Sequence, residues 1–359
     1  MATASLRPCG DFRTSYGADQ YLLLTKSIGI WTFAAIGLLV IAPAVVDSYI
    51  ISLLILIGMY GIAALGLNIL VGMTGQISLG HAAFFGFGAF SSAWLNSTTG
   101  IPVILTIPLA GLMTTAIGMV FGIPAARIKG LYLAIATLAS QFILQDFFAR
   151  ADWFSGGSSG SLAETVTLFG FAFDSDQRYY YLVLFWTILS LVAVANLKRS
   201  RDGRALVAIR DHYLSAQIMG INLTKYRILA FGISSFFAGL GGALLGHYLG
   251  FVSAEGFTIL LSIQFLAMII IGGLGSVMGT MLGSAFIVLL PQVMEALTRG
   301  LFEMFPQSLA GLGLSAGQAY IKEMSVGAAI ILFLIFEPQG LAHRVKLIRQ
   351  GWKLYPFSY

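Results

Sequence analysis

Several polar but uncharged side chains lie inside or next to long apolar runs of this chain. Five of them occur where glycine-rich segments interrupt those runs: Asn68, Gln76, Ser78, His81 and Ser276. Amide, hydroxyl and neutral imidazole groups donate and accept hydrogen bonds without a fixed charge. Such groups can bind a zwitterionic or amide-like solute, so these residues are candidate contacts for a small polar solute.

Two glycine-rich segments, residues 66–81 and 272–279, surround these side chains. The glycines that we include among the candidate path residues are Gly72, Gly75, Gly80, Gly272, Gly273 and Gly275. Glycine costs about 1 kcal/mol of helix propensity relative to alanine, so both segments predict broken helices. Broken helices at membrane depth are tolerated where their backbone groups line a cavity or are buried in protein. The pair therefore indicates a translocation path, with close helix packing through small residues as the alternative.

The apolar runs that must position these breaks identify the class of protein. Apolar residues make up 58% of the chain and charged residues 10%, compared with about 25% charged residues in soluble domains. Since a spanning helix needs about 20 apolar residues, we predict an all-α polytopic membrane protein with about ten transmembrane helices. The predicted helices lie near 27–46, 49–71, 81–96, 101–126, 131–148, 179–196, 228–248, 257–271, 276–294 and 323–337.

The distribution of lysine and arginine predicts the orientation of this domain, residues 27–337. With ten crossings both tails, 1–26 and 338–359, lie on one side. Placing them in the cytoplasm puts 16 of the 20 basic residues inside and only Arg150, Arg178, Arg299 and Lys322 outside. The net charge of +5 is therefore explained by topology and not by a nucleic-acid partner.

Two loops predicted to face outward, 149–179 and 296–322, contain flexible glycine-rich and polar stretches. They could contact a docking protein, but we expect plain solvated linkers.

Chemistry beyond solute binding has little support in the sequence. Four scattered histidines and one cysteine supply neither a catalytic cluster nor a metal site. The predicted spans hold almost no ionisable side chains, which argues against an ion-coupled secondary carrier, although that class remains a remote alternative. His81 is expected to bond a neighbouring helix as a neutral side chain, with a proton relay as the alternative.

The chain also lacks the GxxxxGK[ST] loop that binds nucleotide phosphates, so energy for uphill transport must come from a separate ATPase. The loop 197–227 is the large cytoplasmic segment. Leu206, Ile209, Tyr213 and Ala216 recur there at helical spacing, and Gly220 ends the predicted helix. Its candidate coupling residues are Arg204, Ile209, Arg210, Asp211, Tyr213, Ala216, Met219 and Gly220. A surface helix that binds only membrane lipid is the alternative.

Four separate stretches carry a resemblance to a known family: 67–90, 201–220, 272–283 and Phe-Glu-Pro-Gln-Gly-Leu at 336–341. Together they resemble the second permease subunit of branched-chain amino acid ABC importers, over roughly residues 50–345. The loop around Gly220 resembles the EAA coupling motif of that family, but Leu214-Ser215-Ala216 stands where the motif reads Glu-Ala-Ala.

The resemblance implies a bacterial inner-membrane protein that is not itself an enzyme and binds no cofactor. It implies a heterodimer with a paralogous permease, two ATPase subunits that bind ATP and Mg, and a periplasmic substrate-binding protein. Permeases for urea, short amides or carboxylates are similar to this family, so these substrates stay open as alternatives.

Overall fold

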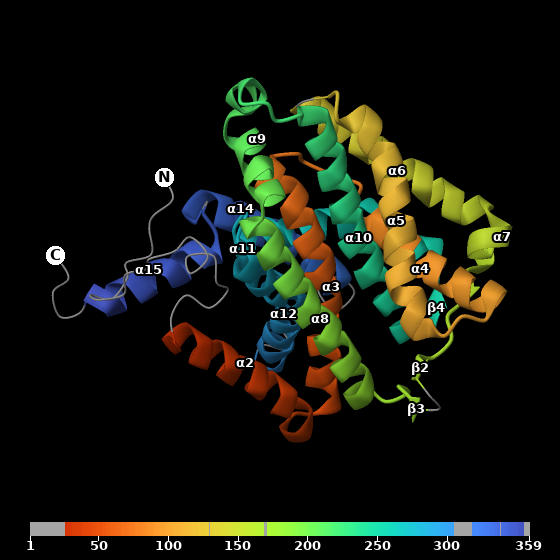
Figure 1. The fold of residues 1–359 in the computed structure, drawn as a ribbon. Coiled ribbons are helices and arrows are strands. Elements are labelled where there is room, and N and C mark those ends of the chain that lie inside the picture. Colours follow the sequence, from red (N-terminus) through yellow and green to blue (C-terminus); the bar gives the residue numbers. More distant parts are fainter. Residues whose placement is uncertain (1–25, 129, 169–170, 305–317, 338, 355–359) are drawn as a thin grey trace.

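A computed structural model describes residues 26–128, 130–168, 171–304, 318–337 and 339–354 (Figure 1). Each of the ten predicted apolar segments forms a helix: α2 (Lys26–Val45), α3 (Ser48–Leu67), α4 (His81–Thr99), α5 (Val103–Ala125), α6 (Leu131–Arg150), α8 (Asp176–Arg199), α10 (Leu223–Leu249), α11 (Ile259–Gly272), α12 (Val277–Met304) and α14 (Gln318–Phe336). The predicted cytoplasmic helix is α9 (Arg201–Ile218), and α15 (Leu341–Leu354) follows α14. The all-α prediction is confirmed.

Fewer of the described helices qualify as membrane spans by length and apolar composition than the ten predicted. Among the described residues seven helices are long and apolar enough, or eight if the pair α14 and α15, bent by 49°, is one span. The apolar part of α2 is short, at Gly29–Val45. Helix α4 carries buried His81, Ser91 and Ser92, and protein surrounds its first thirteen residues. These polar side chains, together with the polar end Asn96–Thr99, explain why α4 is not counted among the apolar spans although it has 19 residues.

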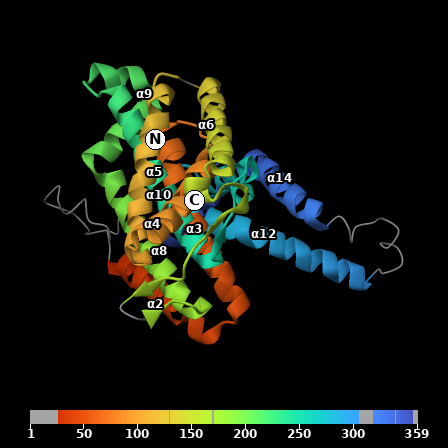
Figure 2. The same cartoon turned by 90° about the vertical axis from the view of Figure 1, so that its right-hand side faces the viewer.

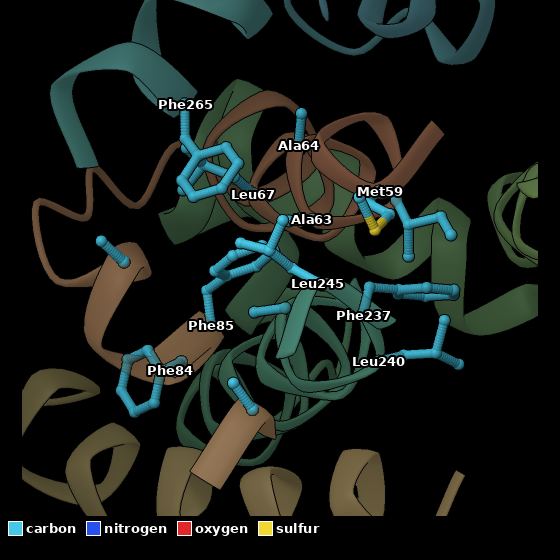
Figure 3. Packing of buried hydrophobic residues seen from close by; sticks show 14 of the residues in the cluster. Met59, Ala63, Ala64, Leu67, Phe84, Phe85, Phe237, Leu240, Leu245 and Phe265 are labelled. Atoms are coloured by element: carbon cyan, nitrogen blue, oxygen red, sulfur yellow. The ribbon is translucent and has the colours of Figure 1, made fainter. Parts of the chain in front are cut away.

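Helix α10 forms the centre of the bundle and packs against α3, α4 and α5. Small residues allow this packing, because a side chain on Gly88 or Gly242 would overlap the backbone of the facing helix. Figure 3 shows the apolar core beside these contacts, where side chains of α3, α4, α10 and α11 meet, Phe85 and Phe265 among them. This core holds the two glycine-rich segments in place.

The segment between α6 and α8 is folded. It contains α7 (Asp152–Ser155), η2 (Gly157–Ser159) and the strands β1 (Ser161–Leu162), β2 (Thr167–Leu168) and β3 (Phe171–Ala172). Strand β1 pairs with β4 (Phe251–Val252), which precedes η3 (Ala254–Gly256), and β2 pairs with β3.

The interpretation of the 149–179 loop as a plain solvated linker is therefore wrong. Phe154, Ser155 and Val166 are buried, and His247 Nδ1 at the end of α10 donates a hydrogen bond to the Glu164 carbonyl at 2.7 Å. These contacts hold the loop against α10. In Figure 1 strands β2 and β3 lie at one end of the bundle and α9 lies at the opposite end.

Helices α12 and α14 extend away from the bundle on one side, as Figure 2 shows. Helix α12 runs to Met304, beyond the predicted end at 294, and contains Pro291. The second glycine-rich outer loop falls largely on 305–317, which lies outside the described residues, as do the predicted N-terminal tail up to residue 25 and residues 355–359.

Candidate functional site

The first glycine-rich segment interrupts a helix, as predicted. Helix α3 passes at Leu67 into a π-helical turn, η1 (Asn68–Met73), and the chain then runs without regular structure through most of the segment to α4. Gly75 turns the chain with φ +71°, a conformation that favours glycine. Because π-helical turns are rare and are often found at functional sites, this break is a candidate site.

The second glycine-rich segment separates α11 from α12. Helix α11 ends at Gly272, after which Gly273 has φ +112° and Gly275 has φ +76°. A side chain on Gly272 would overlap the Gly279 carbonyl, so the start of α12 lies directly against the end of α11. The second break is therefore a tight reversal between two helices.

The two breaks contact each other through the buried side chain of Asn68. Its Nδ2 donates hydrogen bonds to Thr280 Oγ1 at 2.7 Å and to the Ser276 carbonyl at 3.1 Å. Its Oδ1 accepts a hydrogen bond from the Gly275 N–H at 2.7 Å. Asn68, Gly72, Gly275 and Ser276 thus form one cluster, here called the break junction. The sequence analysis did not single out Thr280, which lies one helical turn after Ser276.

Replacing Gly72 by alanine is expected to destabilise the protein by about 1–3 kcal/mol, because a Cβ there would overlap Asn68 Oδ1 and the Gly275 backbone nitrogen. The measurement is the thermal midpoint of the purified protein in detergent. Gly256→Ala is the matched control, since no atom lies within 4 Å of the added Cβ and φ is not positive. Equal midpoints for the two variants would contradict the close contact at the break junction.

Helix α4 begins with caps from distant helices, because Gly80 at its N-terminus has no side chain. The Ala82 N–H donates to Ser262 Oγ and the Ala83 N–H to Gln141 Oε1, both at 2.9 Å. Gln141 Nε2 in turn donates to the Phe257 carbonyl at 2.7 Å. The sequence analysis missed Gln141 and Ser262. Their signal was the same as that of Asn68, a polar side chain inside an apolar run.

His81 is buried and Nε2 lies 2.8 Å from the Ala63 carbonyl of α3. A carbonyl only accepts, so Nε2 carries the proton. This contact favours the structural interpretation of His81 over a proton relay.

The remaining candidates for path lining are packed inside the protein. Ser78 is fully buried, and a side chain on Gly80 would lie 2.5 Å from the Thr137 carbonyl. Gln76 is 4% exposed, and its side-chain amide has no hydrogen-bond partner among the described residues. Gly273 faces the segment after α14, with the Gln339 carbonyl 3.0 Å from a Cβ built on it. These contacts are those of close helix packing, and the path-lining role of the set stays a prediction.

Helix α9 and the end of α8 are bonded to both breaks. Arg210 Nη1 donates to the Gly72 carbonyl at 2.6 Å, and Lys198 Nζ donates to the Gly275 carbonyl at 2.5 Å. Arg210 also pairs with exposed Asp211 at 2.9 Å, an interaction that contributes little in water. A displacement of α9 would therefore act directly on the backbone of η1.

Helix α9 is not one continuous amphipathic helix. His212 has non-helical angles, φ −157° and ψ 91°, and its Nδ1 accepts a hydrogen bond from the Ser215 N–H at 3.2 Å. His212 therefore caps a second short helix and changes which side chains face the bundle.

The apolar residues before and after this kink have different surroundings. Leu206 and Ile209 are 0% and 4% exposed and Ala216 is buried, so these three side chains pack within the chain itself. Of the two anchors that we predict for an ATPase, Ile209 and Tyr213, only Tyr213 is exposed in the structure. Ile218 and Met219 are 85% and 82% exposed. Tyr213, Leu214, Ile218 and Met219, which are all exposed, are here called the α9 tip.

Gly220 ends α9 in the left-handed conformation, as predicted, with φ +86°. The Ile221 N–H donates to the Ala216 carbonyl and the Gly220 N–H to the Gln217 carbonyl, both at 3.0 Å, which is the Schellman pattern. Arg204, another predicted coupling residue, is exposed and donates to the Arg199 carbonyl at 2.7 Å.

Comparison with known proteins gives consistent matches over this fold. A family model described as "Branched-chain amino acid transport system / permease component" matches residues 49–335. The high-affinity branched-chain amino acid transport system permease protein LivM of Salmonella typhimurium is 32% identical over 85% of this chain and 73% of its own length. No solved structure gives a significant match.

Two further relatives are a LivM protein from a second organism and a differently named permease, LivH. A probable LivM of Methanocaldococcus jannaschii is 26% identical over 72% of this chain and 73% of its own length. The permease protein LivH of Salmonella typhimurium is 24% identical over 79% of this chain and 91% of its own length. The chain is thus similar to two differently named permeases of one organism, with the higher identity to LivM.

Proposed function

Because this chain belongs to the family of permease components of branched-chain amino acid transport systems, we propose that it forms half of the translocation path of an ABC importer in the bacterial inner membrane. In this proposal the substrate is a branched-chain amino acid released by a periplasmic binding protein. Separate ATPase subunits, which bind ATP and Mg, drive the transport. The chain itself is a multi-pass membrane permease and carries no catalytic group in the proposal.

The observation that carries the ATPase part of the proposal is the bonding of α9 and the end of α8 to the two breaks. Arg210 contacts Gly72 in the first break, and neighbouring Lys198 contacts Gly275 in the second. The α9 tip presents apolar side chains at the end of the bundle, outside the spans on either side of it. Exposed apolar groups in water favour a protein partner. An ATPase bound there would act on the first break through α9 and on the second break through the end of α8, which directly precedes α9.

The second permease is proposed to be a paralogue. This chain is similar to both LivM and LivH of one organism, and the names of these two proteins assign both to the high-affinity branched-chain amino acid transport system. A heterodimer of two such chains would complete the path. The folded segment between α6 and α8, at the end opposite α9, is the proposed contact for the binding protein.

The test is co-purification of the tagged chain with the products of neighbouring genes, followed by uptake into proteoliposomes. Leucine, isoleucine and valine are compared with urea, a short amide and a carboxylate, each with the cognate binding protein. ATP-dependent leucine uptake supports the proposal. Uptake of urea without leucine would move the chain to the alternative substrate class, and uptake driven by an ion gradient without ATP would reject the ABC class.

Ile218→Asp and Met219→Asp are each expected to weaken ATPase binding roughly 30-fold, since truncating or charging a buried interface anchor costs about 2 kcal/mol or more. The measurement is retention of the ATPase subunits on the detergent-solubilised chain. Leu162→Asp, on exposed strand β1 at the opposite end, is the control and should retain them. If both α9 variants retain the ATPases as the control does, the α9 tip is not the docking surface.

The orientation is tested with single cysteines in a Cys9→Ser background. Gln217→Cys on α9 should react with an impermeant maleimide only after the cells are opened, and Ser158→Cys in η2 should react in intact cells, because both positions are exposed. The expectation follows from the lysine and arginine distribution. The reverse labelling pattern would invert the proposed topology.

A further inference from the structure

A groove of about 160 Å³ lies between α3, α11, α12 and α14, away from the break junction. Its walls come from the middle of α3, α11 and α12, so it lies at mid-depth of these helices. Pockets for drug-sized ligands measure roughly 300–1,000 Å³, so this groove can hold only a small solute or one part of it. Most of the lining is aliphatic, including Met268, Ile287 and Val288.

Three uncharged polar side chains also line the groove: Tyr60, Gln264 and Gln292. Gln292 Oε1 accepts a hydrogen bond from Tyr49 at 2.6 Å, which leaves its amide N–H groups as donors. Within the described part of the chain no hydrogen bond is recorded for the Tyr60 hydroxyl or the Gln264 amide. Polar groups without partners at membrane depth are costly, so they indicate a polar occupant.

The backbone of α12 adds one more acceptor. Pro291 lies inside this helix and lines the groove together with Ile287. Proline has no N–H, so the carbonyl of the residue four positions earlier loses its helical hydrogen bond. The Ile287 carbonyl therefore accepts no helical hydrogen bond from residue 291, and Ile287 lines the groove. Freed backbone carbonyls in interrupted membrane helices coordinate coupling cations in secondary transporters, and an ammonium group can make the same kind of contact by donating to the carbonyl.

On the premise of the proposed function, we infer that this groove is a contact site for the transported solute and takes a neutral, zwitterionic amino acid with a branched aliphatic side chain. The Ile287 carbonyl and the amide oxygen of Gln264 accept from the ammonium group. The Tyr60 hydroxyl and the Gln292 amide donate to the carboxylate. The aliphatic wall around Met268 and Val288 contacts the side chain.

The chemistry of the groove favours this occupant over others. It has no formal charge among its lining residues, so a solute with net charge would lose hydration without an ion partner. An uncharged site binds a zwitterion weakly. Weak binding suits a transport path, because the solute must be able to dissociate again. A lipid acyl chain would use only the aliphatic wall and would leave the amides and the phenol without partners.

Two kinds of substitution test the inference in the assembled transporter, reconstituted in proteoliposomes with its ATPases, second permease and binding protein. Gln264→Leu and Pro291→Ala each remove one proposed contact to the ammonium group. Each is expected to lower leucine uptake roughly tenfold, the usual effect of one hydrogen bond to a charged group. Val288→Trp fills the aliphatic part and is expected to lower the ratio of leucine to alanine uptake at least tenfold.

Leu289→Trp is the matched control, because Leu289 is the next residue of α12, is exposed, and does not line the groove. It should keep both uptake and the leucine-to-alanine ratio of the unmodified transporter. If the unmodified transporter moves leucine and all three groove variants match Leu289→Trp, the groove inference is wrong but the proposed function is not affected. An unmodified transporter that moves no branched-chain amino acid would instead reject the proposed function.

One further outcome separates a solute site from a contact between subunits. If Val288→Trp no longer co-purifies with the second permease while Leu289→Trp does, the groove is covered by that subunit, and the inference is wrong. If Val288→Trp assembles and keeps ATPase activity but loses discrimination between leucine and alanine, the inference is supported.

Discussion

Replacing Arg210 by methionine is expected to lower substrate uptake at least tenfold while the ATPase subunits stay bound and still hydrolyse ATP. The Arg210 guanidinium donates to the Gly72 carbonyl at 2.6 Å, and this bond is the direct link between α9 and η1. A hydrogen bond from a charged donor contributes about 1.5–3 kcal/mol, which corresponds to at least a tenfold change in an equilibrium. Methionine keeps much of the length of the side chain and removes the donor.

Arg204→Met is the matched control on the same helix. Although the sequence suggests Arg204 as a coupling residue, its side chain is exposed in the structure, and its hydrogen bond among the described residues goes to the nearby Arg199 carbonyl and not to a break. Losing it should therefore leave the ratio of solute moved to ATP hydrolysed unchanged. That ratio, measured in proteoliposomes, is the readout that a general loss of stability would not change. Equal ratios for the two variants would show that coupling does not pass through the contact of Arg210 with Gly72.

The second large effect is expected at the break junction. Asn68→Leu should destabilise the protein by about 3 kcal/mol or more and abolish uptake. The Gly275 N–H and the Ser276 carbonyl both bond the Asn68 side chain, and an unsatisfied buried polar group costs about 1–3 kcal/mol. The measurements are the thermal midpoint in detergent and the amount of protein that reaches the membrane.

Asn96→Leu controls for the loss of an asparagine near the end of a helix, because the Asn96 amide donates to the Ile101 carbonyl within its own loop. It should cost about 1 kcal/mol. Asn68→Asp keeps an acceptor for the Gly275 N–H and loses both donated bonds, so it should fall between wild type and Asn68→Leu. If Asn68→Leu is as stable as Asn96→Leu, the hydrogen bonds of the break junction do not stabilise the fold.

The helices could be predicted from the sequence because each one depends on local composition. The segment predicted at 131–148 is Leu131–Arg150 in the structure, and both breaks fall at the predicted glycines. The expected count of crossings was less accurate. Helix α4 carries polar side chains at its start, in its middle and at its end, and the apolar part of α2 is short, so neither helix is counted as a span.

The contacts within the site could not be predicted in the same way. Asn68 and Gly275 are separated by 207 positions, and their spacing along the chain gives no indication that they meet. The caps from Gln141 and Ser262 on α4 also depend on how distant helices pack. A periodic pattern identifies a helical face but not its partner.

In helix α9 the backbone conformation of one residue divides an apolar face that the sequence predicts to be continuous. Leu206, Ile209 and Tyr213 have the spacing of a single apolar face, yet the non-helical His212 separates Tyr213 from the other two. Histidine is not a strong helix breaker, so nothing in the sequence indicated this kink. The end of the helix at Gly220 was predictable because a glycine in the left-handed conformation is a common local signal.

The distance along the chain between Asn68 and Gly275 also bears on biosynthesis. Ribosomes add about 5–20 residues per second, so the 207 residues added after Asn68, up to and including Gly275, take about 10–40 s to make. During that interval η1 lacks the later segment that bonds the Asn68 side chain and lies against the Gly72 backbone. The newly made first part of the protein therefore needs protection until α12 arrives, from the insertion machinery or from transient contacts with other helices. A chain that stops before Gly275 is therefore expected to be degraded faster than the full-length chain.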